Sequence, residues 1–229
     1  MTGLRQGILF PLLVLVAVLA GCGNDPGGGT GTQLIGSILK GNGQNDTPKT
    51  TPASIDPAGL VPIALRAVKG PVMLAVVESR NAIAIMGRSA RNGPYSTWIT
   101  ASRQTVTLKH GIVTATRGLG DDLMNADVDS VASLIRTRHA GTGWRAMYFL
   151  DGEGKTYRLD LQCTVIPGPA QPLTIGKLRI ASRRVDETCH AGNLTVENTY
   201  WTDSAGRIWQ ARQWVSPGVG YLVTQQLRR

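Results

Sequence analysis

The sequence has few of the side chains on which most enzyme chemistry depends. Its 229 residues include three histidines, none of which has a carboxylate or cysteine partner at metal-ligand spacing. It contains no nucleophile-elbow motif, no metalloprotease motif and no phosphate-binding glycine loop. A single Gly-Leu-Gly at residues 118–120 lacks the third glycine of a dinucleotide-binding loop. These absences predict a protein with no catalytic residues, no metal and no cofactor.

Long apolar runs are scarce as well. The main one is Ile8–Ala20, which carries no charge and follows the positive Arg5. A membrane-spanning helix needs about 18 to 20 apolar residues, so this shorter run indicates a signal peptide over residues 1–21. The sequence Leu-Ala-Gly-Cys that ends at Cys22 resembles the lipobox of bacterial lipoproteins, where the cysteine is lipidated and becomes the new N-terminus. An ordinary secreted protein with an incidental cysteine is the alternative.

Lipidation of Cys22 would determine where the protein resides. Two or more acyl chains, palmitate among them, anchor a protein stably, whereas one chain does not. Bacterial lipoproteins that stay at the inner membrane usually have an aspartate after the cysteine, and here that residue is Gly23. The lipobox therefore implies a lipid anchor in the outer membrane, on its periplasmic face.

Cysteine is rare in the rest of the chain, where only Cys163 and Cys189 occur. In the oxidising periplasm a single pair has a single connectivity, so we expect a disulfide. A loop of about 26 residues would make that disulfide worth about 3–4 kcal/mol in the chain-entropy description. A metal site that includes the neighbouring His190 is the alternative.

Acidic side chains are outnumbered by basic ones, and the formal net charge is +9. Nucleic acid is not an expected partner in the periplasm. Anionic polysaccharide, phospholipid headgroups or an acidic protein surface would match the charge. Lysines and arginines that are dispersed over the surface and only solvate it would account for the charge equally well.

The composition divides the chain into a tether and a domain. Residues 22–54 are rich in glycine, threonine, asparagine and proline, which predicts a flexible tether with a reach of about 30 Å. Residues 55–229 have the length of one domain and consist mainly of β-branched runs at hairpin spacing. They predict a large antiparallel meander that forms a curved sheet or half-barrel. One or two short helices should pack on its concave side, the main one over residues 127–138 with Asp127 as its N-cap.

The segment that leads into this helix carries adjacent carboxylates, Asp121 and Asp122, after Arg117, Gly118 and Gly120. Adjacent residues of an extended segment point to opposite sides, so the two aspartates cannot form the facing pair of a glycosidase. We expect a structural corner in which one aspartate caps the turn and the other pairs with Arg117. Binding of a cation or a sugar is the alternative, followed by catalysis.

Two of the five tryptophans, Trp209 and Trp214, fall in one expected strand. They are separated by an odd number of residues and should point to opposite faces of the sheet. They cannot both be core residues of a sheet that is buried on one face only. One of them is therefore a candidate contact for a glycan or a protein partner.

Three stretches resemble the YjbF/GfcB family of lipoproteins: Ala115–Val128, Arg145–Cys163 and Tyr200–Arg229. The most specific part is the run Arg-Gly-Leu-Gly-Asp-Asp-Leu at 117–123, and the resemblance extends over the whole domain and the lipobox. The family is associated with exopolysaccharide and group 4 capsule production. The resemblance implies an outer-membrane lipoprotein with a meandering sheet, which works beside other polysaccharide-export proteins of the periplasm and outer membrane. It implies no known catalytic residue.

These observations favour a non-enzymatic accessory factor in the secretion or assembly of exopolysaccharide or capsule. A carrier of lipid or acyl chains is one alternative, because a half-barrel with a helix across it can enclose an apolar cavity. A polysaccharide-modifying enzyme that uses Asp121 or Asp122 is the other.

Overall fold

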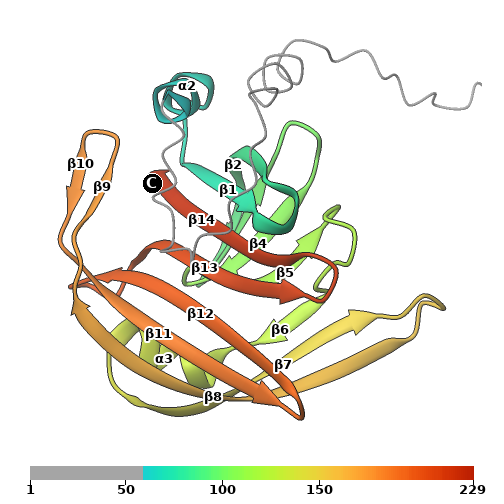
Figure 1. Ribbon diagram of the computed structural model, residues 1–229. Helices are drawn as coiled ribbons and strands as arrows, with labels where there is room; N and C mark the ends of the chain where they lie inside the picture. The colour runs from blue at the N-terminus through green and yellow to red at the C-terminus, as the bar shows by residue number, and fades with distance from the viewer. Residues whose placement is uncertain (1–58) are drawn as a thin grey trace, which may run out of the picture. The chain divides into compact units, whose positions relative to one another are not determined.

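A computed structural model describes residues 59–229, which form a mainly β domain (Figure 1). Cys22, the predicted signal peptide, the whole predicted tether and the first four residues of the predicted domain, 55–58, lie outside the described residues. The elements are α2 (Leu60–Ala67), β1 (Val72–Val77), η1 (Glu78–Arg80), β2 (Ala82–Asn92), β3 (Tyr95–Ile99), β4 (Thr105–Lys109), β5 (Ile112–Arg117), β6 (Asn125–Asp127), α3 (Asp129–Thr137), β7 (Gly141–Leu150), β8 (Thr156–Ala170), β9 (Leu173–Ile175), β10 (Leu178–Ile180), β11 (Ser182–Ala191), β12 (Leu194–Asp203), β13 (Ile208–Ser216) and β14 (Gly220–Arg228).

Twelve of the strands form one antiparallel sheet in the order β5-β4-β3-β2-β1-β14-β13-β12-β11-β8-β7-β6. Neighbours in the sheet are neighbours in the chain, except that β1 pairs with the last strand, β14, and that the small β9–β10 hairpin separates β8 from β11. The pairing of β1 with β14 leaves β5 and β6 as the two edges. The predicted meander is therefore confirmed, and the sheet is left open at the corner between β5 and β6.

The two edges of this sheet almost meet. The N–H of Thr116 in β5 donates to the carbonyl oxygen of Leu123, just before β6, at 2.9 Å. Elsewhere along β5 a side chain replaces a strand partner: Gln213 Oε1 accepts from Val113 N at 2.9 Å, and Gln213 Nε2 donates to Gly111 O at 3.1 Å. These bonds cover part of an edge that would otherwise expose unpaired main-chain groups. The sheet is nearly closed.

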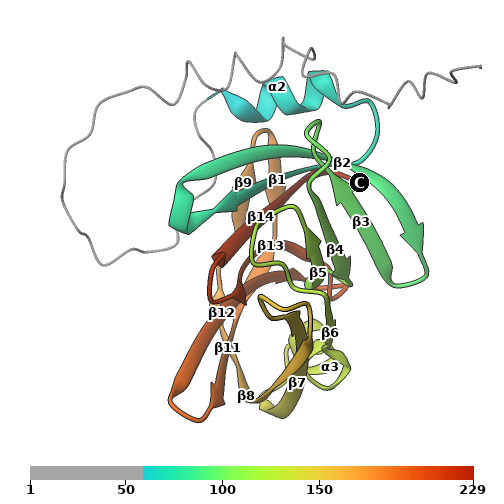
Figure 2. The same ribbon diagram turned by 90° about the vertical axis from the view of Figure 1, so that its right-hand side faces the viewer.

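The sheet is apolar on both faces where its first and last strands pair. In β1, Met73 points into the main core, whereas Leu74 points into a second cluster on the opposite face. This two-sided burial explains why β1 is a continuous apolar run. The main core takes in the apolar face of α3, as predicted for the enclosed side, and α2 covers the second cluster together with the β9–β10 hairpin. Figure 2 shows α3 beside β7 and β8, at the end of the domain far from α2.

Two glycines of β7 allow α3 to lie close to the sheet. A Cβ atom on Gly143 would be 2.7 Å from Ser130 Oγ and 3.0 Å from Val131 Cγ1, and one on Gly141 would be 3.0 Å from Leu134 Cδ2. Ser130 Oγ in turn accepts a hydrogen bond from the main-chain N–H of Trp144 at 3.3 Å. Glycine in a strand interior is typical of such close approach.

Replacement of Gly143 by alanine should therefore destabilise the domain by about 1–3 kcal/mol, because the added methyl group overpacks the contact with α3. The measurement is the free energy of unfolding in urea. Gly152→Ala, in the β7–β8 turn, is the matched control, since a Cβ atom there would meet nothing within 4 Å. Equal stability of the two variants would contradict the close packing of α3 on β7.

Candidate functional site

The corner between β5 and β6 is held by Asp122. Its carboxylate accepts hydrogen bonds from Thr116 Oγ1 at 2.7 Å, Gly118 N at 2.6 Å and Leu119 N at 3.1 Å. Gly118 and Gly120 have φ angles of 82° and 105°, in the left-handed region that favours glycine. Asp122 is thus the aspartate that caps the turn.

Arg117 does not form the ion pair with a neighbouring aspartate that the sequence predicts. Its guanidinium donates to main-chain carbonyl oxygens, those of Thr116, Leu123 and Met124, and not to either aspartate. The expected Arg117–aspartate pair is therefore replaced by a clamp on the main chain. The physical reason is that the chain folds back at the corner and brings these carbonyl groups within reach of the guanidinium.

Asp121 points away from Asp122 and fastens the corner to the β13–β14 turn. Its Oδ2 accepts from Gly218 N at 2.7 Å, and its main-chain oxygen accepts from Ser216 Oγ at 2.5 Å. The turn after β1 joins them, because an Arg80 nitrogen donates to Leu119 O at 2.7 Å and Ser79 Oγ donates to Val219 O at 2.8 Å. Three turns that are distant in the chain are therefore tied together where the sheet fails to close.

Asp127 acts at the start of α3, one position earlier than expected. The helix begins at Asp129 with Val128 as its N-cap residue, and Asp127 Oδ1 accepts the Asp129 N–H at 3.1 Å. Asp127 itself is the last residue of β6, opposite Ala146 of β7. Because Asp127 pairs with β7, α3 begins one residue later than the sequence pattern predicts.

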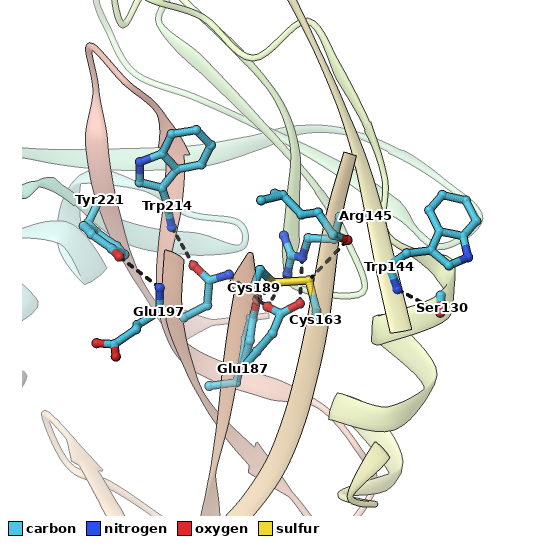
Figure 3. Close-up of a disulfide and its surroundings, with 12 residues drawn as sticks. Ser130, Trp144, Arg145, Cys163, Glu187, Cys189, Glu197, Trp214 and Tyr221 are labelled. Carbon is cyan, nitrogen blue, oxygen red and sulfur yellow. Dashed lines mark hydrogen bonds and ion pairs between the residues drawn. A yellow bond between two sulfur atoms is a disulfide. The ribbon is translucent and has the colours of Figure 1, made fainter. Parts of the chain in front are cut away.

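A buried charge network, which was not predicted from the sequence, lies in the main core. The Arg145 guanidinium on β7 donates to both oxygens of Glu187 on β11, each at 2.7 Å. The side chains of Arg145 and Glu187 are 2 % and 0 % exposed. Glu187 Oε2 also accepts from Tyr200 OH at 2.8 Å and from Asn198 Nδ2 at 2.9 Å, both on β12. Figure 3 shows Arg145 and Glu187 turned toward each other beside the disulfide.

The network keeps its charges in spite of its burial. Burial by itself lowers the pKa of Arg145, but the neighbouring Glu187 carboxylate outweighs it, so the pKa is raised and the guanidinium stays protonated. Burial raises the pKa of Tyr200 well above its usual value, so its hydroxyl remains a donor. Asn198 Oδ1 accepts the Trp214 N–H at 2.7 Å and extends the network to β13. One set of hydrogen bonds thus connects β7, β11, β12 and β13 in the interior.

The sequence contained a signal for this network. Arg145 lies between Gly143 and Met147 on the inward-facing side of β7, and Glu187 lies between Val185 and Cys189 on the inward-facing side of β11. A charged residue on the apolar face of a strand needs a partner of opposite charge. The two strands are not adjacent in the sheet, so the pairing itself could not be read from the alternation.

The disulfide between Cys163 and Cys189 is present in the structure and joins directly opposite residues of β8 and β11. Both cysteines are buried in the main core. Their sulfur atoms and a Glu187 oxygen lie within 4.8 Å of one another, but the sulfurs are bonded to each other and Glu187 is held by Arg145. His190, the suggested third ligand, is exposed and its Nδ1 lies 3.0 Å from Thr195 Oγ1. The arrangement fits a structural cross-link beside the charge network.

The two tryptophans of β13 do lie on opposite faces, and both are packed. Trp214 belongs to the main core. Trp209 packs against the second cluster, where its Nε1 donates to Asp203 Oδ2 at 3.0 Å and the Arg229 guanidinium lies 4.4 Å from its ring centre. This part of the sheet is covered on both faces, and not on one face only, which is why both tryptophans are packed. The most exposed tryptophan of the described residues is Trp144, at 46 %. Figure 3 shows Trp144 on the β7 side of the disulfide, next to Ser130.

Within residues 59–229, no helix is both long enough and apolar enough to cross a membrane.

Comparison with known proteins places the chain among lipoproteins. The family model described as the group 4 capsule polysaccharide lipoprotein GfcB, YjbF matches residues 45–227. Among solved structures, the chain is similar to the crystal structure of the hypothetical lipoprotein YmcC from Escherichia coli (K12), with a TM-score of 0.62 and 16 % identity over 74 % of this chain and 89 % of that one. No curated protein matches. At this identity the structural likeness shows the fold alone, whereas the family match spans the corner, the charge network and the disulfide.

Proposed function

Because this chain belongs to the YjbF family of group 4 capsule polysaccharide lipoproteins, we propose that it is a non-enzymatic outer-membrane lipoprotein. It acts as an accessory factor in the secretion or assembly of capsule or exopolysaccharide. Cys22 is its lipidated anchor, and other polysaccharide-export proteins of the periplasm and outer membrane are its partners. The observation that carries the proposal is the family match over residues 45–227.

The hydrogen bonds that the candidate carboxylates already make within the domain support a non-enzymatic role. Asp121 and Asp122 each accept main-chain N–H groups of turns, and Glu187 is enclosed by Arg145 and its neighbours. A general acid or base must reach its substrate within hydrogen-bond distance, directly or through one water. All three carboxylates are therefore used in hydrogen bonds that stabilise the fold.

The packing of the interior favours an accessory factor over an acyl-chain carrier. The main core is occupied by α3 and by large buried side chains such as Trp98 and Phe149. A cavity beside β1 and β2 measures about 110 Å³, and it is lined mainly by apolar residues such as Val77, Met86 and Leu222 but also by Arg80 and Gln104. That volume corresponds to roughly four water molecules at their liquid density, which is too small for an acyl chain.

The proposal is tested in cells with two full-length variants. Cys22→Ala should move the protein from the outer-membrane fraction to the soluble periplasm and lower the amount of surface polymer, because the lipid anchor is lost. The double variant Asp121→Asn/Asp122→Asn should leave polymer yield and structure unchanged wherever it is folded and anchored. Fractionation with immunoblotting and polymer quantification give the two readouts.

Two outcomes would contradict the proposal. If Cys22→Ala remained with the membrane, the anchor would be wrong. If the folded, anchored aspartate variant produced polymer of altered structure, the enzymatic alternative would replace the accessory role.

A further inference from the structure

An open crevice lies between three segments of the domain that contribute to neither the corner nor the charge network. Its volume is about 510 Å³, within the range of about 300–1,000 Å³ that is typical of small-molecule sites. One wall is the β4–β5 turn with Lys109 and His110, the second is the exposed side and C-terminal end of α3, and the third is the β12–β13 turn at residues 204–206.

The crevice is positively charged. Lys109, Arg136 and Arg138 line it together with a single carboxylate, Asp129. Asp129 forms an ion pair with Lys109. Arg138 donates to Ser204 O at 3.3 Å. In the part of the chain from residue 59 onward, no carboxylate lies within ion-pair distance of Arg136. The arginines therefore keep donors for an anionic ligand.

The walls of the crevice are held in place. A Cβ atom on Gly206 would lie 2.6 Å from the main-chain oxygen of Arg136, so the β12–β13 turn is packed tightly against the end of α3. Asp203 fixes that turn, because its Oδ1 accepts from the main-chain N–H groups of Ala205 and Arg207, each at 2.9 Å. The site is therefore preformed.

Two side chains that line the crevice come from main-chain positions in the left-handed region. His110 and Arg138 have φ angles of 54° and 57°, and they are two of the four non-glycine residues with positive φ in the described chain. Arg138 is the left-handed C-cap residue of α3, and His110 precedes Gly111 in the two-residue hairpin turn between β4 and β5, so ordinary turn geometry fixes where both side chains begin.

An arginine in the last turn of a helix also has a structural role, because it compensates the negative end of the helix dipole. That role accounts for Arg136 and for Arg138. It does not account for Lys109, which belongs to β4 and is brought to the same crevice by the tertiary structure.

We propose that this crevice binds a carboxylate-bearing sugar segment of an acidic polysaccharide. Arg136 and Arg138 receive the carboxylate, for which the planar guanidinium is well matched, and the polar groups of the two turns face the hydroxyl groups. The identification of the ligand as a polysaccharide rests on the proposed function, whereas the anionic chemistry rests on the crevice itself.

His110 provides a readout that reports on this crevice. Burial and the positive charges of Arg136 and Lys109 lower its pKa, against the opposing effect of Asp129. A carboxylate bound beside the arginines would add negative charge and should raise that pKa.

The test uses full-length protein purified in detergent and a short oligogalacturonate, with a neutral oligogalactose of the same length as the matched ligand. Calorimetry should show binding of the acidic oligosaccharide and not of the neutral one, and NMR titration should show a higher His110 pKa when the acidic ligand is bound. Arg136→Gln/Arg138→Gln should weaken binding at least tenfold. Arg158→Gln, an exposed arginine on β8, is the matched control and should bind as the wild type does.

Equal binding of the acidic and neutral oligosaccharides, or unchanged binding by the folded double variant, would overturn the proposal. So would a preference for anionic phosphatidylglycerol vesicles over the oligosaccharide, which would make the crevice a membrane contact. These outcomes are separable from the proposed function, because surface polymer would still depend on Cys22 in cells even if the crevice bound no sugar.

Discussion

Replacement of Arg145 by methionine should destabilise the domain by about 3–5 kcal/mol. The substitution keeps most of the aliphatic volume but leaves the Glu187 carboxylate buried without its counter-charge, and a buried charge without a partner is strongly destabilising. The side chain of Glu187 is 0 % exposed, so water cannot replace the lost donors without local opening. Equilibrium unfolding in urea, followed by tryptophan fluorescence, gives the change in free energy.

Two further variants separate the pair from the rest of the protein. In Arg145→Met/Glu187→Leu neither charge of the pair remains, so this double variant should be more stable than Arg145→Met alone. Arg158→Met removes an arginine from the adjacent strand β8, where its ion pair with Asp160 is exposed, and should leave the unfolding midpoint unchanged. The prediction would be wrong if the double variant were no more stable than Arg145→Met alone, because the unpaired Glu187 charge would then not be the cause of the destabilisation.

Loss of the disulfide should lower the stability of the domain by about 3–4 kcal/mol, because the unfolded chain is then no longer constrained over a loop of 26 residues. For a domain of this size, 1 kcal/mol corresponds to about 2–4 °C in Tm, so the Cys163→Ala/Cys189→Ala variant should melt roughly 6–16 °C below the wild type. Differential scanning calorimetry provides the measurement.

A reducing agent distinguishes the covalent effect from the change of side chain. It should lower the Tm of the wild type toward that of the double alanine variant and should not change the Tm of that variant. If the reductant left the wild-type Tm unchanged while it converted Cys163 and Cys189 to free thiols, the disulfide would not stabilise the domain.

The disulfide and the charge network should act together. Glu187 lies two residues before Cys189 on the same inward face of β11. A carboxylate oxygen of Glu187 and the Sγ atom of Cys189 lie within 4.8 Å of each other. Groups this close commonly share their energetic effects. Together they fix β7, β8, β11 and β12 around α3, and this helix and the β12–β13 turn form two walls of the basic crevice. The stability of the interior thus maintains the geometry of the proposed binding surface.

The strand pattern was predictable because each hairpin is local. The β-branched runs on either side of Asp203–Gly206 gave the hairpin of β12 and β13 directly, and the helical periodicity after Asp127 located α3 to within two residues. The short strand β6 was not predictable, since its three residues form a strand only through their pairing with β7.

The sites were predictable to a smaller extent. The turn chemistry around Gly118 and Gly120 pointed to a structural corner, and Asp122 caps it, but the sequence could not show that Arg117 turns to carbonyl groups or that Asp121 reaches Gly218 across the molecule. The basic crevice could not be predicted from the sequence for the same reason. Lys109 and Arg136 are distant in the chain and carry no motif.

The sequence by itself thus determined the β-rich meander, the corner after β5 and the pairing of the only two cysteines that lie within the domain. Each of these follows from local patterns or from the lack of any alternative partner. Tertiary structure alone decided the pairing of β1 with β14, the burial of Arg145 against Glu187 and the gathering of basic side chains beside α3. These features depend on residues that are far apart in the chain, and their meeting is set by how the sheet curves and packs.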